Sequence, residues 1–354
     1  PLTDAEYKYS DVMFDPKTGD LTYYLDNGSK TLQHLDGRVD QIIGIEPNAT
    51  KTYSDNAGNI VRVTSASGVE TTYKYDGNKL VETNGPMGNF KRNAEGNWEG
   101  PLDNVVSINP RATDGSMAIV FKDGSLIDGA ADGSKTKMVT DASGNIVKVT
   151  GPTGAETTYK YDEKNKLVES NGPLGNYKLN ADGTWTGPLG NVDSVSVRPT
   201  DGVTVLSLKD GSRVEGRPDG GRIETIDGAV KSFDSKGELT ESWSKNGDYS
   251  SFKYDANGNR TEMNVWQVDK KTGLYPDQPQ TFKADSPGGV LTDVDKKYKS
   301  VDVDSKTGDI TYVLSDGSKT TQHLDGRVDK VIGVEPNAIK TFSDSNGNII
   351  KVTN

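Results

Sequence analysis

The 354-residue chain contains no cysteine, only two histidines and no long apolar run. Without cysteine there is neither a disulfide framework nor a thiolate metal site, so cysteine usage does not settle the compartment. No stretch approaches the roughly 18 consecutive apolar residues of a membrane span. Hydrophobic residues make up 32% of the chain, which is little for compact cores. Because the 15 tyrosines and 4 tryptophans lie within alternating patterns, we expect an ordered but elongated chain.

The chain also has fewer basic than acidic residues. It contains 41 lysines and arginines and 52 aspartates and glutamates, which give a net charge of -11 at pH 7. Phosphates of nucleic acids and anionic lipids demand a basic face, so the charge argues against both as partners. The 40 glycines form no phosphate loop and no dinucleotide fingerprint. We therefore expect no enzymatic activity, no cofactor and no membrane span.

What the chain has instead is self-similarity, because glycines recur in register along it. The equivalent glycines form three sets: Gly19, Gly115, Gly202 and Gly308; Gly28, Gly124, Gly211 and Gly317; and Gly37, Gly133, Gly220 and Gly326. They divide the chain into a lead-in at 1–8 and repeats 1 to 4 at 9–104, 105–191, 192–297 and 298–354. Repeats 1 and 4 are nearly identical over residues 9–64 and 298–353, and the fourth repeat is truncated.

Turn signals recur about every ten residues and predict roughly thirty short strands and no helix. Asp-Gly and Asn-Gly pairs predict two-residue type I′ loops, in which both central residues have positive φ. Between turns, apolar residues alternate with polar ones, as in half-buried strands. We expect four equivalent side chains to share one buried face: Leu25, Phe121, Leu208 and Leu314. The predicted fold is all-β, an elongated tandem array of mostly antiparallel short strands and β-hairpins.

Tyr-Asp pairs recur in the second half of the repeats, at Tyr75-Asp76, Tyr161-Asp162 and Tyr254-Asp255. The run Thr71-Thr72-Tyr73-Lys74 leads into the first pair. This pattern resembles the Rhs/YD-repeat family of bacterial surface and secreted proteins. The resemblance implies a ribbon of β-hairpins at a cell surface or in a secreted protein. In toxin complexes of that family the ribbon spirals into a shell around a cargo.

Neither histidine predicts a catalytic or metal site. His34 and His323 occupy one position in two near-identical repeats, and the equivalent residues of the other repeats are Ala130 and Arg217. A calcium site is the other candidate, because Asp302, Asp304 and Asp309 crowd one hairpin. Aspartate in a turn more often binds its own backbone, so we expect no catalytic residue and no metal ligand.

Two weaker kinds of site remain as expectations. Trp98 and Trp185 lie at the same place in repeats 1 and 2, where they could stack on sugar rings or cap a thin core. Asn27 and Asn48 begin glycosylation sequons, although the counterparts of both in repeat 4 do not match the sequon.

These observations favour a non-enzymatic, extracellular or cell-surface structural protein, a segment of a fibre, rod or stalk. Its expected partners are further copies of itself or continuing repeats of the same chain. Two alternatives stay open, an adhesin or glycan-binding rod and a shell fragment of an Rhs-type secreted toxin. For the fibre, a strand at 349–353 would expose unpaired amides and carbonyls, so we expect continuing repeats or another copy to lie against it. An exposed and unpaired strand there would favour the adhesin rod.

Overall fold

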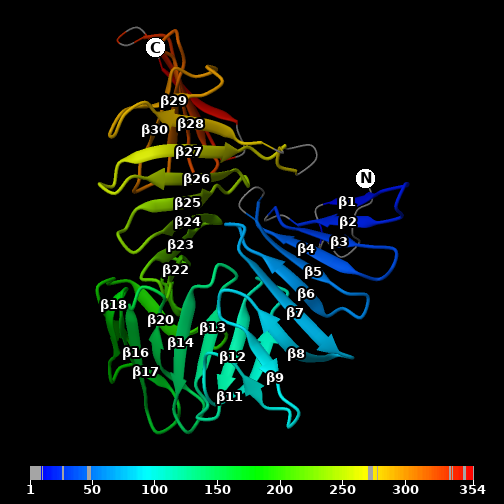
Figure 1. Cartoon of the computed structure of the whole chain (residues 1–354). Coiled ribbons are helices and arrows are strands. Elements are labelled where there is room, and N and C mark those ends of the chain that lie inside the picture. Colours follow the sequence, from blue (N-terminus) through cyan, green and yellow to red (C-terminus); the bar gives the residue numbers. More distant parts are fainter. Residues whose placement is uncertain are drawn as a thin grey trace. The chain divides into compact units, whose positions relative to one another are not determined.

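The computed structural model describes residues 9, 11–25, 28–45, 49–269, 274–276, 278–334, 336, 338–345 and 348–353. Over these residues the chain forms strands β1 to β35 and no helix (Figure 1). Within each of three sheets, strands that are consecutive in sequence are neighbours, and the described pairs run antiparallel. The predicted all-β fold of short antiparallel strands is therefore confirmed. The expected lead-in at 1–8 lies outside the described residues.

The first sheet has ten strands within repeat 1. They are β1 (Asp11–Phe14), β2 (Leu21–Tyr24), β3 (Lys30–Gln33), β4 (Val39–Ile43), β5 (Thr50–Ser54), β6 (Ile60–Thr64), β7 (Glu70–Asp76), β8 (Lys79–Asn84), β9 (Phe90–Arg92) and β10 (Trp98–Glu99). The second sheet has nine strands within repeat 2. They are β11 (Val105–Pro110), β12 (Met117–Phe121), β13 (Leu126–Gly129), β14 (Lys135–Thr140), β15 (Ile146–Thr150), β16 (Glu156–Tyr161), β17 (Leu167–Gly172), β18 (Gly175–Leu179) and β19 (Trp185–Thr186).

The third sheet has sixteen strands and spans repeats 3 and 4. Those of repeat 3 are β20 (Val192–Val197), β21 (Thr204–Leu208), β22 (Arg213–Gly216), β23 (Arg222–Ile226), β24 (Ala229–Phe233), β25 (Leu239–Trp243), β26 (Tyr249–Tyr254), β27 (Arg260–Trp266), β28 (Gln280–Ala284) and β29 (Leu291–Asp293). Those of repeat 4 are β30 (Ser300–Val303), β31 (Ile310–Val313), β32 (Lys319–Gln322), β33 (Val328–Ile332), β34 (Ile339–Ser343) and β35 (Ile349–Thr353).

The described residues fall into two compact units, the first chiefly up to Leu179 and the second chiefly from Asn180 onward. Sheets one and two begin and end close to the limits expected for repeats 1 and 2. No such break separates repeats 3 and 4, whose strands form one continuous sheet. The division into four repeats therefore remains a prediction from the sequence.

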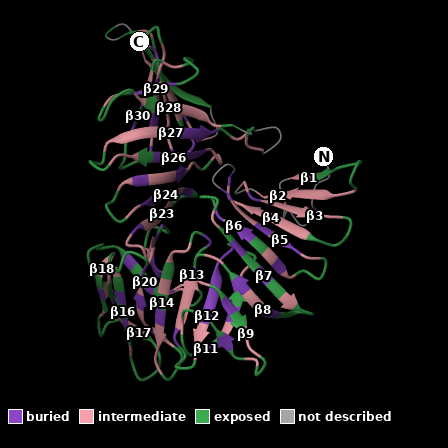
Figure 2. Cartoon of the chain, viewed as in Figure 1, coloured by how far each residue is buried: buried purple, intermediate pink, exposed green. Residues whose placement is uncertain are grey.

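Burial alternates along the strands, as Figure 2 shows by colour. In β7, Thr71 and Tyr73 are buried while Thr72 and Lys74 are exposed. A pleated strand points successive side chains to opposite faces, so every second residue joins the core. The four side chains expected on one buried face all prove half-buried: Leu25, Phe121, Leu208 and Leu314.

The turns that end these strands correct one detail of the prediction. Gly211 has a φ of 84°, as expected, but Asp210 before it does not have a positive φ. The loop is therefore a type I turn followed by a left-handed glycine, in place of a two-residue type I′ loop. The Asp210 carboxylate accepts a hydrogen bond from the Ser212 amide at 2.9 Å, which stabilises this form. Among the Asp-Gly pairs, Asp227-Gly228 does have positive φ at both residues.

Candidate functional site

The contacts that recur between successive repeats form the candidate site. At each of them, the first hairpin of one repeat lies against strands from the middle of the preceding repeat. We call these contacts the junctions. Each has at its centre one glycine of the first set, with a positive φ and a backbone hydrogen bond to the residue four positions earlier.

The first junction joins repeats 1 and 2 around Gly115, in the turn between β11 and β12. A Cβ added to Gly115 would lie 2.8 Å from Thr50 Cγ2 and 2.9 Å from Val63 Cγ1. Thr50 begins β5 and Val63 lies on β6. A side chain at position 115 would therefore clash with the preceding repeat, and its φ of 70° also favours glycine.

The second junction joins repeats 2 and 3 around Gly202. A Cβ there would lie 2.5 Å from Val149 Cγ2 and 3.2 Å from Met138 Sδ. Two polar contacts accompany this packing. The Tyr159 hydroxyl donates to the Gly202 carbonyl at 2.9 Å, and an Arg111 nitrogen donates to the Thr200 carbonyl at 3.3 Å. The hydroxyl bond satisfies a polar group that would otherwise be buried without a partner.

The third junction joins repeats 3 and 4 around Gly308, which packs against Leu324 of its own repeat and Lys231 of the preceding one. The Lys231 ammonium donates to the Lys306 carbonyl at 2.7 Å and pairs with Glu224 at 3.0 Å. A buried ammonium requires such partners, because its desolvation is costly. The loop after β25 forms two further hydrogen bonds with repeat 4. The Lys245 backbone amide donates to the Leu324 carbonyl at 2.7 Å, and the Asn246 side-chain amide donates to the Gly326 carbonyl at 3.2 Å.

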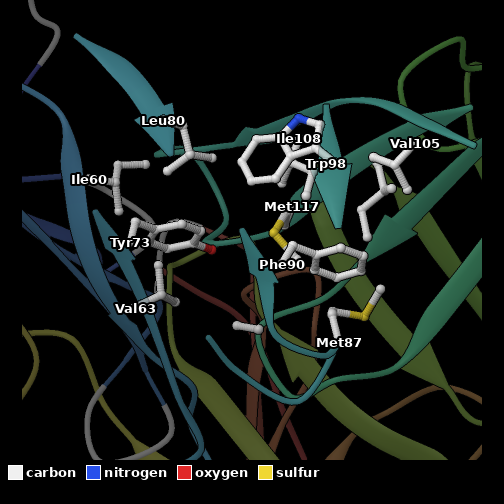
Figure 3. Packing of buried hydrophobic residues seen from close by; sticks show 12 residues of the cluster. Ile60, Val63, Tyr73, Leu80, Met87, Phe90, Trp98, Val105, Ile108 and Met117 are labelled. Carbon is white, nitrogen blue, oxygen red and sulfur yellow. The ribbon is translucent and has the colours of Figure 1, made fainter. Parts of the chain in front are cut away.

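The hydrophobic core crosses the junctions. The cluster shown in Figure 3 contains Val63, Tyr73 and Phe90 of repeat 1 together with Ile108 and Met117 of repeat 2. In the second compact unit, another cluster joins side chains of repeats 3 and 4, among them Phe252, Met263, Phe282, Val301 and Tyr312. Each of these clusters is thus built by two successive repeats.

The Tyr-Asp pairs have a local structural role within the second half of the repeats. The Tyr161 hydroxyl donates to the Ile146 carbonyl at 3.1 Å, and the Tyr254 hydroxyl donates to the Leu239 carbonyl at 2.8 Å. The following aspartate caps a turn, since Asp162 accepts from two turn amides at 2.9 Å each. Partial burial raises the pKa of the corresponding Tyr75 to about 12. The motif thus ties one hairpin to the strand before it.

Each histidine bridges two carboxylates. His34 Nδ1 lies 3.0 Å from Asp20 Oδ2, and Nε2 lies 3.0 Å from Asp40 Oδ2. His323 repeats this arrangement with Asp309 at 2.8 Å and Asp329 at 3.1 Å. Both ring nitrogens face carboxylate oxygens, so the imidazolium form, with two N–H donors, satisfies both contacts.

The contacts around His34 raise the pKa of its ring and lower the pKa of Asp20. The hydrogen bond to Asp40 is the main cause that raises the pKa of His34 above its ordinary value, against a smaller effect of desolvation. Desolvation raises the pKa of Asp20, but hydrogen bonds from His34 and the Leu35 amide outweigh it, and the net pKa is lowered. The cluster therefore favours the ion pair.

The acidic hairpin of repeat 4 uses its carboxylates locally. Asp304 accepts from the Lys306 amide at 2.8 Å and from the Thr307 amide at 3.2 Å. Asp302 binds the amide of the next residue at 2.9 Å, and Asp309 contacts His323. Among the described residues there is no group of three or more acidic or histidine side chains arranged to hold a metal ion.

The other candidate residues do not come together. Trp98 is buried in the cluster of Figure 3, with the Arg92 guanidinium 4.5 Å from its ring centroid. Trp185 is half-buried on β19. Glycan stacking on these rings stays a prediction, and the burial of Trp98 matches the alternative of a core residue. Asn27 and Asn48, the predicted glycosylation sites, lie outside the described residues.

Sequence reasoning identified the junction glycines as turn residues but missed their contacts with the preceding repeat. A turn explains a positive φ, whereas close approach to Val63 or Val149 depends on strands some fifty residues earlier in the chain. The sequence carries one signal of these contacts, because Gly115, Gly202 and Gly308 are glycines at the same position of their repeats. A turn that lies on the surface without such contacts tolerates other residues.

Among known protein families, one matches a segment of the chain. Residues 141–177 match the family model of the RHS Repeat. No curated protein matches the chain. Among the described residues, there is no helix long and apolar enough to cross a membrane.

Solved structures are similar only at low TM-scores. The TCP10 domain of Danio rerio CPAP, in complex with a peptide of Danio rerio STIL, is 20% identical, with a TM-score of 0.17 over 70% of this chain and 98% of that one. The TcdB2-TccC3-Cdc42 structure is 10% identical, with a TM-score of 0.18 over 93% and 22%. The Photorhabdus luminescens Tc holotoxin pore is 11% identical, with a TM-score of 0.19 over 95% and 25%.

At these scores none of the three structures carries an argument about the present chain. The family match does, because residues 141–177 include the Tyr161-Asp162 pair and the strands on both sides of it. The resemblance to the Rhs/YD-repeat family is therefore confirmed over this segment.

Proposed function

We propose that the chain is a non-enzymatic structural repeat protein, a segment of an extracellular fibre, rod or stalk. The observation that carries the proposal is the junction, at which Gly115, Gly202 and Gly308 each contact the preceding repeat, and a Cβ at Gly115 or Gly202 would lie within 3 Å of it. Repeats that bury their apolar faces against each other are stabilised by their neighbours, and such coupling suits a load-bearing array. The resemblance of residues 141–177 to an RHS Repeat supports an extracellular location.

A matched pair of glycine variants tests the coupling. Gly202 and Gly144 both have positive φ, at 71° and 84°, but only Gly202 has a neighbouring repeat within contact distance of an added Cβ. Gly202→Ala and Gly144→Ala therefore share the backbone strain, and the first adds a clash at the junction. We expect Gly202→Ala to lower the free energy of unfolding by about 1–3 kcal/mol more than Gly144→Ala.

The mechanical consequence is measured by pulling the full chain between its ends. Gly202→Ala should unfold the first compact unit at a lower force than the wild type and the control variant do. Equal unfolding forces and equal stabilities for the two variants would contradict a coupled array. The proposed structural function would then lack its main supporting observation.

A shell fragment of an Rhs-type secreted toxin is the second candidate, and the RHS Repeat match at 141–177 is the observation that favours it. Negative-stain electron microscopy separates the two. A fibre segment should give extended particles, and a shell fragment should give strongly curved ones that close around a lumen.

A further inference from the structure

Repeat 3 has an arginine at a position where repeats 1 and 2 have a leucine. The residue opposite the tyrosine of the Tyr-Asp pair is Leu80 in repeat 1, Leu167 in repeat 2 and Arg260 in repeat 3. Leu80 is buried in the cluster that repeats 1 and 2 build together. Leu167 packs against the same cluster as Val197 of repeat 3. This position therefore faces the next repeat, and at the third junction it holds a guanidinium group.

The Arg260 guanidinium reaches into repeat 4. It donates to the Val303 carbonyl at 3.3 Å and to the Ser305 hydroxyl at 3.0 Å. Within repeat 3 it donates to the Tyr254 hydroxyl at 3.3 Å, so these three acceptors are uncharged. The Arg260 Nε is buried and has no hydrogen-bond partner among the described residues. A buried guanidinium with an unpaired donor costs free energy, so stability alone does not explain the arginine.

The repeat that follows differs at the position that Arg260 contacts. Three residues before the junction glycine, repeat 4 has Ser305, whereas repeat 2 has Ala112 and repeat 3 has Pro199. Ala112 and Pro199 belong to the repeats that follow a leucine, and Ser305 belongs to the repeat that follows the arginine. A serine hydroxyl accepts a hydrogen bond from a guanidinium, which the side chains of alanine and proline cannot do. The two sides of each junction are thus matched in polarity.

Repeat 1 contains a close alternative to the first hairpin of repeat 4. Its counterpart of Ser305 is Pro16, and its counterpart of Val303 is Phe14. The turn itself is the same, because in both repeats the glycine amide donates to the carbonyl of the aspartate four positions earlier, at 2.8 and 2.7 Å. The two hairpins therefore differ in the side chains next to the turn. Near-identical segments of one chain can pair wrongly during folding, and such a difference opposes it.

We propose that Arg260 is a specificity residue of the third junction. It makes repeat 3 accept a following repeat that has a hydroxyl at the position of Ser305, and disfavour one that has alanine or proline there. With the wrong neighbour, a buried guanidinium donor loses its acceptor, and that loss is the penalty. The inference rests on the proposed structural function and deepens it, because it names a residue that decides which repeats can be neighbours.

A double-mutant cycle tests the proposal. Ser305→Ala and Arg260→Leu are made singly and together in the full chain, and amide hydrogen exchange of β30 and β31 is measured. Ser305→Ala alone should lower the protection of these amides by about tenfold or more, because a buried donor loses its acceptor. Arg260→Leu and the double variant should both stay within about threefold of the wild type, because leucine needs no hydroxyl. A merely structural arginine would not give this rescue.

Two further variants sharpen the measurement. Ser305→Pro introduces the residue found at Pro16 and Pro199, and the turn of repeat 1 shows that proline is compatible with this backbone. It should therefore follow the pattern of Ser305→Ala in both backgrounds. Ser235→Ala is the matched control, because Ser235 is an exposed turn serine of repeat 3. It should leave the exchange of β30 and β31 unchanged.

Three results would overturn the proposal. The first is an equal loss of protection from Ser305→Ala with arginine and with leucine at position 260. The second is unchanged exchange in Ser305→Ala itself. The third is a tenfold loss from Arg260→Leu alone, which would make the arginine a stabilising residue. The proposed structural function is tested separately, because Gly202 and Gly144 lie in the first compact unit and Arg260 and Ser305 lie in the second.

Discussion

Repeats 1 and 4 have nearly the same sequence over residues 9–64 and 298–353, but they are buried differently. Tyr312 of repeat 4 belongs to a core cluster with side chains of repeat 3, whereas its counterpart Tyr23 is half-buried. At the other end of the same segment the order reverses, because Ile60 of repeat 1 is buried and Ile349 of repeat 4 is exposed. The difference teaches that the neighbouring repeat, and not the local sequence, decides burial at these positions.

Other features are the same in both repeats, and they are the local ones. The Ser29 hydroxyl accepts a hydrogen bond from the Gly44 amide at 2.9 Å, and Ser318 does the same for Gly333 at 2.9 Å. The histidine of each repeat bridges the same two aspartates. Contacts within two or three consecutive strands thus follow from the sequence of one repeat, while burial of the apolar face follows from the array.

The largest expected effect comes from truncating the same leucine in the two repeats. Leu324→Ala should lower the free energy of unfolding by about 2–5 kcal/mol, because it opens a cavity at the third junction. Leu35→Ala should change it by less than about 0.5 kcal/mol, because that side chain is largely in solvent. Chemical denaturation of both variants measures the difference. Equal losses would show that the local hairpin, and not the junction, stabilises the leucine.

A smaller effect is expected from the local His34 cluster, and it depends on pH. Since the hydrogen bond to Asp40 raises the pKa of His34 in the folded chain, the cluster stabilises the fold fully below the ordinary value of 6.5. That contribution is lost as the pH rises through the raised pKa. The difference in unfolding free energy between wild type and His34→Gln should therefore shrink from about pH 5.5 to about pH 8.5.

An NMR titration of the His34 ring checks the origin of this effect. Its pKa should fall toward the ordinary value in Asp40→Asn, because the main cause of the shift is removed. A stability difference that does not change with pH would mean that the imidazole is held by packing and not by its charge.

The sequence was sufficient to predict the all-β fold, because turn glycines and alternation are local signals. It also predicted the positive φ that Gly28, Gly124, Gly211 and Gly317 all have. It misjudged the loops, since the side chain of Asp210 stabilises a type I turn that the Asp-Gly pair alone does not reveal.

The junction contacts could not be predicted in the same way. Whether Val63 touches Gly115 depends on how a later hairpin lies on an earlier sheet, and no local pattern encodes that placement. The burial of Trp98 has the same cause, because its cluster includes side chains of repeat 2. A tryptophan in a thin fold can face solvent or core, and the next repeat determines which.

The most direct test of neighbour-dependent burial compares one position in the two near-identical repeats. Val63→Cys and Val352→Cys are labelled separately with a small thiol reagent in native protein. The cysteine at position 352 should react nearly as fast as in the denatured chain, and the one at position 63 should react far more slowly, because Gly115 of the next repeat covers it. Equal labelling rates would contradict the account.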